Sequence, residues 1–101
     1  MVMVHIISWK KLDDFIIKHP NSESSLKSWY KILKNTSFKD FNELRKLFNS
    51  VDLVGNLTVF NISGNNFRLI AAIHFNTQKV FIRYILTHSD YDKGKWKKEI
   101  I

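Results

Sequence analysis

The apolar residues of this chain change their spacing once, near residue 51, and this change limits the folds that the chain can adopt. Before it, apolar residues recur at helical spacing, as in Leu26, Trp29 and Leu33, which is the pattern of a helix buried on one side. After it, segments rich in Val, Ile, Phe and Thr alternate with short polar turns, a pattern typical of antiparallel strands. The order predicts an α+β domain whose N-terminal helices pack on one face of an antiparallel sheet.

Three helices are expected in the first half. Ser8 is placed to cap the first helix, and Asn21 or Ser22 to cap the second. Asp40, with Glu43 three residues later, resembles a capping box and is expected to open the third.

Four strands are expected, three of them consecutive. The short apolar run at 2–7 predicts a strand that joins the sheet. The segments 57–63, 66–75 and 79–87 predict an antiparallel meander with turns at 64–65 and 77–78. A chain of 101 residues has room for one core, so we expect residues 1–101 to form a single domain.

The turn lengths give the meander a register. A four-residue loop closed by Ile62 and Phe67 places Asn61 beside Arg68, and a two-residue turn at 77–78 places Arg68 opposite Thr87. Side chains alternate between the two faces of a strand, so this register collects polar side chains on one face. They are Asn61, Arg68, Lys79, Arg83 and Thr87. A slip of one residue would place the two arginines on opposite faces.

The charge of the chain favours an anionic partner. Sixteen Lys and Arg stand against nine Asp and Glu, a net charge of +7, which favours nucleic acid or an acidic protein. No carboxylate lies between Asp52 and Asp90, so paired carboxylates are not expected to perform the chemistry of this half. The basic tail, residues 93–101, is expected to be a flexible electrostatic anchor for RNA. Its cations are Lys93, Lys95, Lys97 and Lys98.

Several classes of protein are excluded by composition. The chain has no cysteine, which excludes disulfides, zinc fingers and thiol nucleophiles. Its four histidines are far apart and lack the spacing of a helical metal site, so we expect no metal and no cofactor. The N-terminus lacks a basic leader followed by a long apolar run, and no segment has the length of a membrane span. A cytoplasmic protein without membrane contact is expected.

Several segments together resemble the HigB toxin family of the RelE/ParE superfamily. The resemblance covers almost the whole chain and is densest from 52 to 92. Its most specific parts are a hairpin in which Gly64 and Asn65 precede Arg68 and Leu69, and a closing motif formed by Thr87, His88, Tyr91 and Asp92. The segments that carry it are 5–8, 29–30, 52–56, 59–71, 74–83 and 87–92.

This resemblance implies a fold, an activity and partners. The fold would be N-terminal helices against a twisted antiparallel sheet, and the activity a ribosome-dependent cleavage of messenger RNA. The inhibitor would be a HigA-type antitoxin, a helix-turn-helix protein that also represses the shared operon. Operator DNA would therefore be contacted only through the antitoxin.

Metal-free cleavage of RNA requires a base for the 2′-hydroxyl proton, an acid for the leaving 5′-oxygen and cations for the phosphorane. The products would be a 2′,3′-cyclic phosphate and a 5′-hydroxyl. We assign phosphate contact to Arg68 and Arg83, because a planar guanidinium suits bidentate binding of phosphate. His88 and Tyr91 are the candidate acid and base, with the assignment between them open. Tyr91 is also suited to stacking on a base.

Each assignment has a structural alternative. Arg68 would form a salt bridge, although no acidic residue is near it in sequence, and Arg83 would contact acidic residues of the antitoxin. Trp96 would either stack on a base or cover the edge of the sheet. The residues expected to contact RNA around this site are Asn61, Lys79, Lys93, Lys95, Lys97 and Lys98.

Two other functions fit the same pattern. A superfamily relative that inhibits DNA gyrase would need no catalytic residues. A non-catalytic RNA- or protein-binding module would need only cations and exposed aromatic side chains. The set of Arg68, Arg83, His88 and Tyr91 favours the endoribonuclease.

Overall fold

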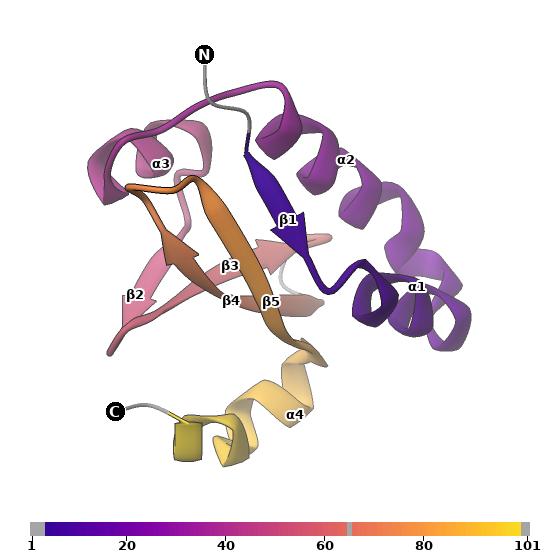
Figure 1. Ribbon diagram of the computed structural model, residues 1–101. Helices are drawn as coiled ribbons and strands as arrows, with labels where there is room; N and C mark the ends of the chain where they lie inside the picture. Colours follow the sequence, from indigo (N-terminus) through magenta and orange to yellow (C-terminus); the bar gives the residue numbers. More distant parts are fainter. Residues whose placement is uncertain (1–3, 65, 100–101) are drawn as a thin grey trace.

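A computed structural model describes residues 4–64 and 66–99 of the chain, the last two of these by their backbone alone. Within these residues a five-stranded sheet has helices on both faces (Figure 1). The strands are β1 (His5–Ile7), β2 (Asp52–Val54), β3 (Leu57–Ile62), β4 (Phe67–His74) and β5 (Lys79–Thr87). Their order across the sheet is β1-β5-β4-β3-β2. The predicted α+β class and the predicted meander of β3, β4 and β5 are confirmed. The sheet is mixed, because β1 runs parallel to β5 while the other pairs are antiparallel.

The three predicted N-terminal helices are present. Two further helical elements, which the sequence analysis did not predict, follow the sheet. The first group is α1 (Trp9–Lys18), the 3₁₀ turn η1 (Pro20–Ser22), α2 (Glu23–Lys34) and α3 (Phe41–Leu47). The second is α4 (His88–Lys93) and the 3₁₀ helix η2 (Lys95–Glu99). Thr87 caps α4 by accepting a hydrogen bond from the Asp90 N–H at 3.1 Å, and Gly94 ends it at a φ of 72°.

Of the three expected N-terminal helix caps, only the cap of α3 is formed by a side-chain hydrogen bond. Asp40 accepts a hydrogen bond from the Glu43 N–H at 3.0 Å, and Glu43 in turn accepts from the Lys39 N–H at 3.2 Å. Ser8 and Ser22 lie at the N-cap positions of α1 and α2, but neither side chain makes a cap hydrogen bond. Ser8 instead adopts a left-handed φ of 81°, at which the chain turns from β1 into α1.

The main core lies between the N-terminal helices and one face of the sheet. Leu12 of α1, Trp29 of α2 and Leu44 of α3 are buried against β3, β4 and β5. The helices contribute the apolar side chains that recur at helical spacing, and the strands contribute alternate ones. This packing covers one face of the sheet and leaves the opposite face to the C-terminal segment.

The opposite face of the sheet carries a smaller core under the C-terminal segment. Trp96 of η2 is 3% exposed and packs with Leu57, Val59 and Ile70. Its indole N–H donates to the Tyr91 carbonyl at 3.0 Å, which ties η2 to α4. In place of a flexible tail, residues 93–97 are therefore held on the sheet, and Trp96 covers the sheet face.

The register between β3 and β4 is the predicted one. Ile62 pairs with Phe67, and Asn61 pairs with Arg68. Ser63 and Gly64 open the connecting loop with φ values of 54° and 65°; Asn65, which we expected within this turn, lies outside the described residues.

The predicted register between β4 and β5 is wrong. A four-residue loop, 75–78, connects them, so His74 pairs with Lys79, and Arg68 pairs with Leu86 instead of Thr87. A bulge then shifts the register, because Ile70 pairs with Tyr84 whereas Ala71 pairs with Ile82. Arg83 is the extra residue at this bulge.

The bulge reverses the face of the sheet toward which the later side chains of β5 point. Before it, Val80 and Ile82 point into the main core; after it, Ile85 does so, while Tyr84 and Leu86 join the smaller core on the opposite face. An extra residue in one strand reverses the alternation of the side chains that follow. The bulge thus decides which residues of β5 share a face with Arg68.

Candidate functional site

A polar cavity of about 400 Å³ lies on the face of the sheet opposite to α1 and α2. Its walls come from α3, β2, β3, β4, α4 and the segment that joins α3 to β2. Its polar lining residues are Arg45, Asn49, Ser50, Asp52, Asn61, Arg68 and Tyr91. Three of the residues predicted for the site, Asn61, Arg68 and Tyr91, therefore meet in one cavity.

Arg68 is the buried cation of this cavity. It is 8% exposed, and its Nη1 donates to the Phe67 carbonyl at 3.1 Å. Its guanidinium carbon lies 5.3 Å from the centroid of the Tyr91 ring, a cation–π contact. A largely buried guanidinium acts on an anion more strongly than one in water, because the local dielectric constant is lower.

Tyr91 is held between this guanidinium and an indole. Its ring stacks on Trp96 with centroids 5.1 Å apart and planes 15° from parallel. Burial raises the pKa of the Tyr91 phenol above its ordinary value, and the negative charges of Asp52 and Asp92 raise it further, against the opposing effect of Arg68. The phenol therefore keeps its proton at neutral pH and is a hydrogen-bond donor there.

Sequence reasoning missed several residues of the cavity, three of which carry a charged or amide side chain. Arg45 of α3, Asn49 of the following segment and Asp52 of β2 line it beside Arg68. Asp52 adds a single carboxylate to the cavity, whereas the sequence analysis considered only paired carboxylates and excluded them. No local pattern marks Asp52, because it reaches the cavity only through the pairing of β2 with β3, in which it lies opposite Val59.

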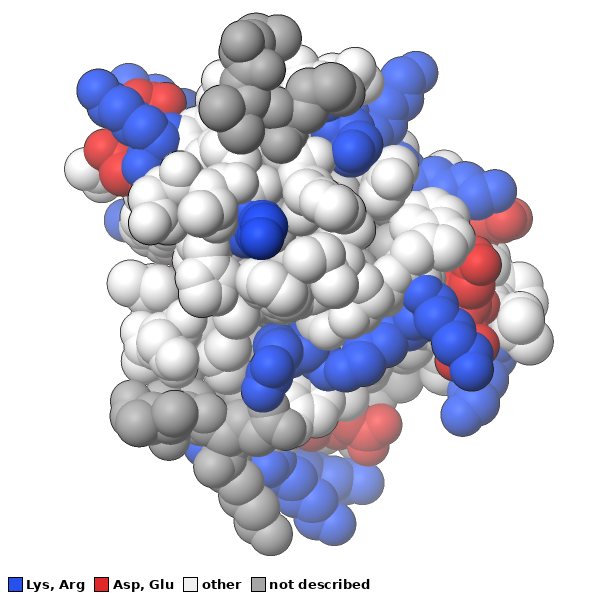
Figure 2. Space-filling view, in the orientation of Figure 1, with Lys and Arg blue, Asp and Glu red and all other residues white. Residues whose placement is uncertain are grey.

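Arg83 lies elsewhere, in a different cavity from Arg68. With Lys11 and Lys18 of α1 it lines a pocket of about 250 Å³ where β5 meets that helix. Lys11 donates to the Arg83 carbonyl at 2.9 Å. Lys and Arg side chains lie side by side across this part of the surface (Figure 2). The prediction that Arg68 and Arg83 share one site is wrong, because they line different cavities. It assumed that side chains alternate regularly along β5, and the bulge at Arg83 interrupts this alternation.

His88 begins α4, directly after β5. Its backbone N–H donates to the Asn66 carbonyl at 2.9 Å, which closes the end of the sheet. Its Nδ1 lies 2.9 Å from a carboxylate oxygen of Asp92, one helical turn further on. His88 shares α4 with Tyr91 but does not line the Arg68 cavity.

Residues 22–94 match the HigB toxin family, which is described as the RelE-like toxic component of a toxin–antitoxin system. The chain belongs to the HigB toxin family. It is 34% identical over 93 residues to the mRNA interferase HigB of Escherichia coli O6:H1, covering 89% of this chain and 90% of that protein. It is also 34% identical over 92 residues to the mRNA interferase toxin HigB of Escherichia coli K12, covering 88% of each chain. The resemblance found in the sequence is confirmed.

The family match contains the whole lining of the Arg68 cavity of this HigB-family toxin, from Arg45 to Tyr91, and ends at Gly94. The indole of Trp96 that stacks on Tyr91 lies beyond it. The cavity is therefore part of the segment by which the chain is assigned to the family.

The predicted RNA-contacting lysines of this HigB-family toxin lie in two places. Lys79 pairs with His74 at the far end of β4, six residues from Arg68 and thus roughly 20 Å away along the strand. Lys93 ends α4, and Lys95 and Lys97 lie in η2, on the face that carries the cavity. The side chain of Lys98 lies outside the described residues.

Within residues 4–64 and 66–99 of this HigB-family toxin, no three His, Asp or Glu side chains are grouped so that they could hold a metal ion. No helix in these residues has the length and hydropathy that crossing a membrane requires.

Proposed function

We propose that the chain is the toxin of a type II toxin–antitoxin system and a ribosome-dependent endoribonuclease that cleaves messenger RNA. Membership of the toxin family supports the first part, and the names of its relatives support the second. The observation that carries the proposal for this chain is the contact between Arg68 and Tyr91 within a polar cavity on the sheet.

Arg68 is proposed to stabilise the transition state. Attack of a 2′-hydroxyl on the adjacent phosphate adds negative charge to the phosphoryl oxygens. The guanidinium of Arg68, held by the Phe67 carbonyl and the Tyr91 ring, is already positioned to bind them. Asn61, its partner across the strands, is proposed to bind the same phosphate or the neighbouring ribose.

Tyr91 is proposed to be the acid. An ordinary phenol, with a pKa of about 10, is protonated at neutral pH, and the raised pKa of Tyr91 acts in the same direction. Tyr91 is therefore proposed to donate a proton to the leaving 5′-oxygen rather than to accept one from the 2′-hydroxyl. Its ring already contacts Trp96 and Arg68, which favours this role over stacking on a base.

Two residues are candidates for the base. Asp52 lines the cavity with Arg68, whereas His88 is paired with Asp92 at the start of α4. Because a single carboxylate lines the cavity, we propose that ribosomal RNA helps to orient the 2′-hydroxyl, and that free RNA is a poor substrate. Asp52→Asn and His88→Ala, compared in single-turnover cleavage, identify the base.

Arg83, Lys11 and Lys18 are proposed to bind a phosphate backbone away from the cleaved bond. Lys79, Lys93, Lys95, Lys97 and Lys98 are proposed to add electrostatic affinity for RNA. The inhibitor is proposed to be a HigA-type helix-turn-helix antitoxin, through which alone the toxin is brought to operator DNA.

The test is cleavage of a messenger RNA programmed on ribosomes by the pure toxin. We expect cleavage within the translated region and a 2′,3′-cyclic phosphate end, with negligible cleavage of the same RNA without ribosomes. Lys10→Ala, on the exposed face of α1, is the matched control and retains activity. Intact messenger RNA, together with failure of DNA supercoiling by gyrase, would instead support a gyrase inhibitor.

A further inference from the structure

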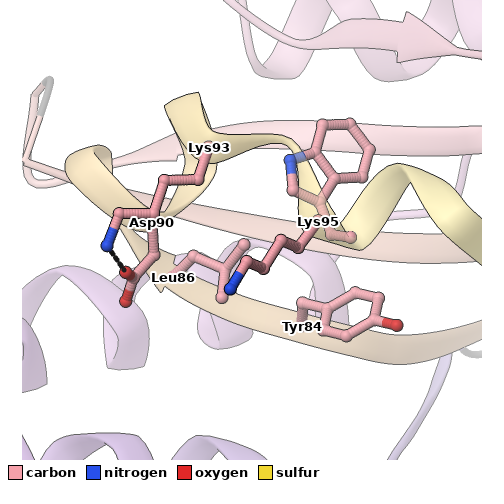
Figure 3. A pocket seen from close by; sticks show the side chains of 6 residues that line it. Tyr84, Leu86, Asp90, Lys93 and Lys95 are labelled. Carbon is pink, nitrogen blue, oxygen red and sulfur yellow. Dashed lines mark ion pairs between the residues drawn. The ribbon is translucent and has the colours of Figure 1, made fainter.

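A second cavity lies beside the candidate site, between β5 and the helical segment that follows it. Its volume is about 280 Å³. Tyr84 and Leu86 of β5 line one side, and Asp90, Lys93 and Lys95 line the other (Figure 3). Trp96 completes the lining. Aromatic and aliphatic surface is thus combined with ammonium groups.

Trp96 connects this cavity with the Arg68 cavity. It lines the second cavity, and its indole stacks on Tyr91, which lines the first. Tyr84, Leu86 and Trp96 belong to the same small core as Tyr91. Both cavities are therefore on one face of the sheet, with the stacked pair of Tyr91 and Trp96 between them. A single polymer lying across this face would reach both.

The chemistry of the lining identifies the occupant. Aromatic rings offer surface on which any base can stack, and ammonium groups bind phosphate. Lys93 and Asp90 form an ion pair at 3.6 Å. Asp90 therefore offsets part of the charge of Lys93, which leaves Lys95 as the cation best placed to bind phosphate. The volume is at the lower limit of ligand pockets, which begin at about 300 Å³, and so suits one base rather than several.

We propose that this second cavity binds one nucleobase of the RNA substrate, next to the nucleotide that is cleaved, with Lys95 on the adjoining phosphate. The proposal rests on the proposed function and adds a base-binding subsite to it. The subsite stacks its base on the ring of Tyr84, and the buried indole of Trp96 forms its inner wall. The register explains how it forms: without the bulge at Arg83, Tyr84 and Leu86 would point into the main core.

Binding of single nucleotides to the full chain tests the subsite without requiring catalysis. The probes are the four nucleoside 5′-monophosphates, with ribose 5-phosphate as the control that lacks a base. The readout is the NMR signal of the Trp96 indole N–H, assigned by its loss in Trp96→Phe. We expect at least one nucleotide to shift this signal in a saturable way, and ribose 5-phosphate to leave it unchanged.

Two variants test the two parts of the subsite. Tyr84→Ala removes one stacking surface and should raise the Kd of the nucleotide by roughly tenfold, the effect of losing one stacked base. Lys95→Ala should weaken binding of the nucleotide more than binding of the corresponding nucleoside. Lys10→Ala, on the exposed face of α1, is the matched control and should leave the Kd unchanged. The spectrum of each variant shows whether it is folded; should Tyr84→Ala unfold, Tyr84→Leu replaces it.

The outcomes separate the subsite from the proposed function. Equal binding of ribose 5-phosphate and the nucleotides would show a phosphate site alone and overturn the proposal, as would the absence of saturable binding. Nucleotide binding that persists in Arg68→Ala supports a subsite independent of catalysis. If the wild-type chain binds nucleotides but cleaves no RNA on ribosomes, the proposed function fails and the base-binding site remains.

Discussion

The guanidinium carbon of Arg68 lies 5.3 Å from the centroid of the Tyr91 ring. One residue comes from β4 and the other from α4. The contact joins the cation of the candidate site to its proposed proton donor, and Trp96 of η2 stacks on the ring of that donor. A change at any of these three residues is therefore expected to affect the other two.

Replacing Arg68 by alanine should abolish most cleavage while the domain stays folded. Removal of one donor from a preorganised site costs about 2.7–4 kcal/mol, or about 100- to 1,000-fold in rate. Single-turnover cleavage on saturated ribosomes, combined with a thermal melt, measures both effects. Arg68→Lys keeps the charge without the planar fork and should recover only part of the rate. A wild-type rate for Arg68→Ala at saturation would show that Arg68 serves binding only.

The Tyr91 phenol should titrate above the ordinary tyrosine value of about 10. NMR of ring-labelled tyrosine assigns its signal by comparison with Tyr91→Phe. Because burial and Asp52 raise this pKa while Arg68 lowers it, Asp52→Asn should lower it and Arg68→Ala should raise it. Shifts in the reverse directions would contradict the arrangement of these three groups.

The raised pKa of Tyr91 also predicts how the free energy of unfolding changes with pH. A raised pKa means that the fold favours the neutral phenol. The contribution of Tyr91 is therefore complete below the unfolded pKa of about 10 and is lost as the pH rises through the higher folded pKa. The free energy of unfolding of Tyr91→Phe, measured with urea, should fall less steeply than that of wild type above pH 10.

Replacing Trp96 by alanine should cost stability, because its indole is 3% exposed over β3 and β4. Truncation of a buried Trp typically costs about 3–5 kcal/mol, measured by urea unfolding. Trp9→Ala is the control, since Trp9 is 40% exposed and should lose less. A Trp96→Ala protein as stable as wild type would mean that residues 95–99 behave as a free tail in solution.

Replacing Gln78 by alanine should weaken the attachment of the 75–78 loop to the segment before α3. The buried Gln78 amide donates to the Phe38 carbonyl at 2.5 Å and accepts from the Phe38 N–H at 3.2 Å. Each buried polar group left unpaired costs about 1–3 kcal/mol. Thr77→Ala, at an exposed neighbour, should change the free energy of unfolding much less. An equal loss in both variants would assign the effect to the turn itself.

Replacing Arg83 by alanine should weaken binding to ribosomes without slowing cleavage at saturation. Arg83 lies with Lys11 and Lys18 in a cavity separate from that of Arg68. Loss of a backbone contact acts on affinity and lowers its dependence on salt. Ribosome binding at several salt concentrations, measured beside the single-turnover rate, checks this. A large loss of rate at saturation would show that Arg83 acts in catalysis.

The sequence by itself determined the three N-terminal helices, the meander of β3 to β5 and the family. Local spacing of apolar residues is sufficient to predict α1, α2 and α3 and the strands β3 to β5, because burial of one face requires that spacing wherever the element packs. Signals for α4 were also present and missed: Thr87 with Asp90 three residues later begins that helix, and Gly94 ends it. Such caps are local, so a sequence carries them.

The tertiary structure alone decided which residues form the site. The bulge at Arg83 and the positive φ of 56° at Gln78 set the register of β5, and Gln78 is held by Phe38, forty residues earlier in the chain. A change of one residue in a loop or strand exchanges the two faces of a sheet. The spacing of side chains within β5 therefore predicted a shared site for Arg68 and Arg83, whereas contacts with distant segments separated them and brought Asp52 to Arg68 instead.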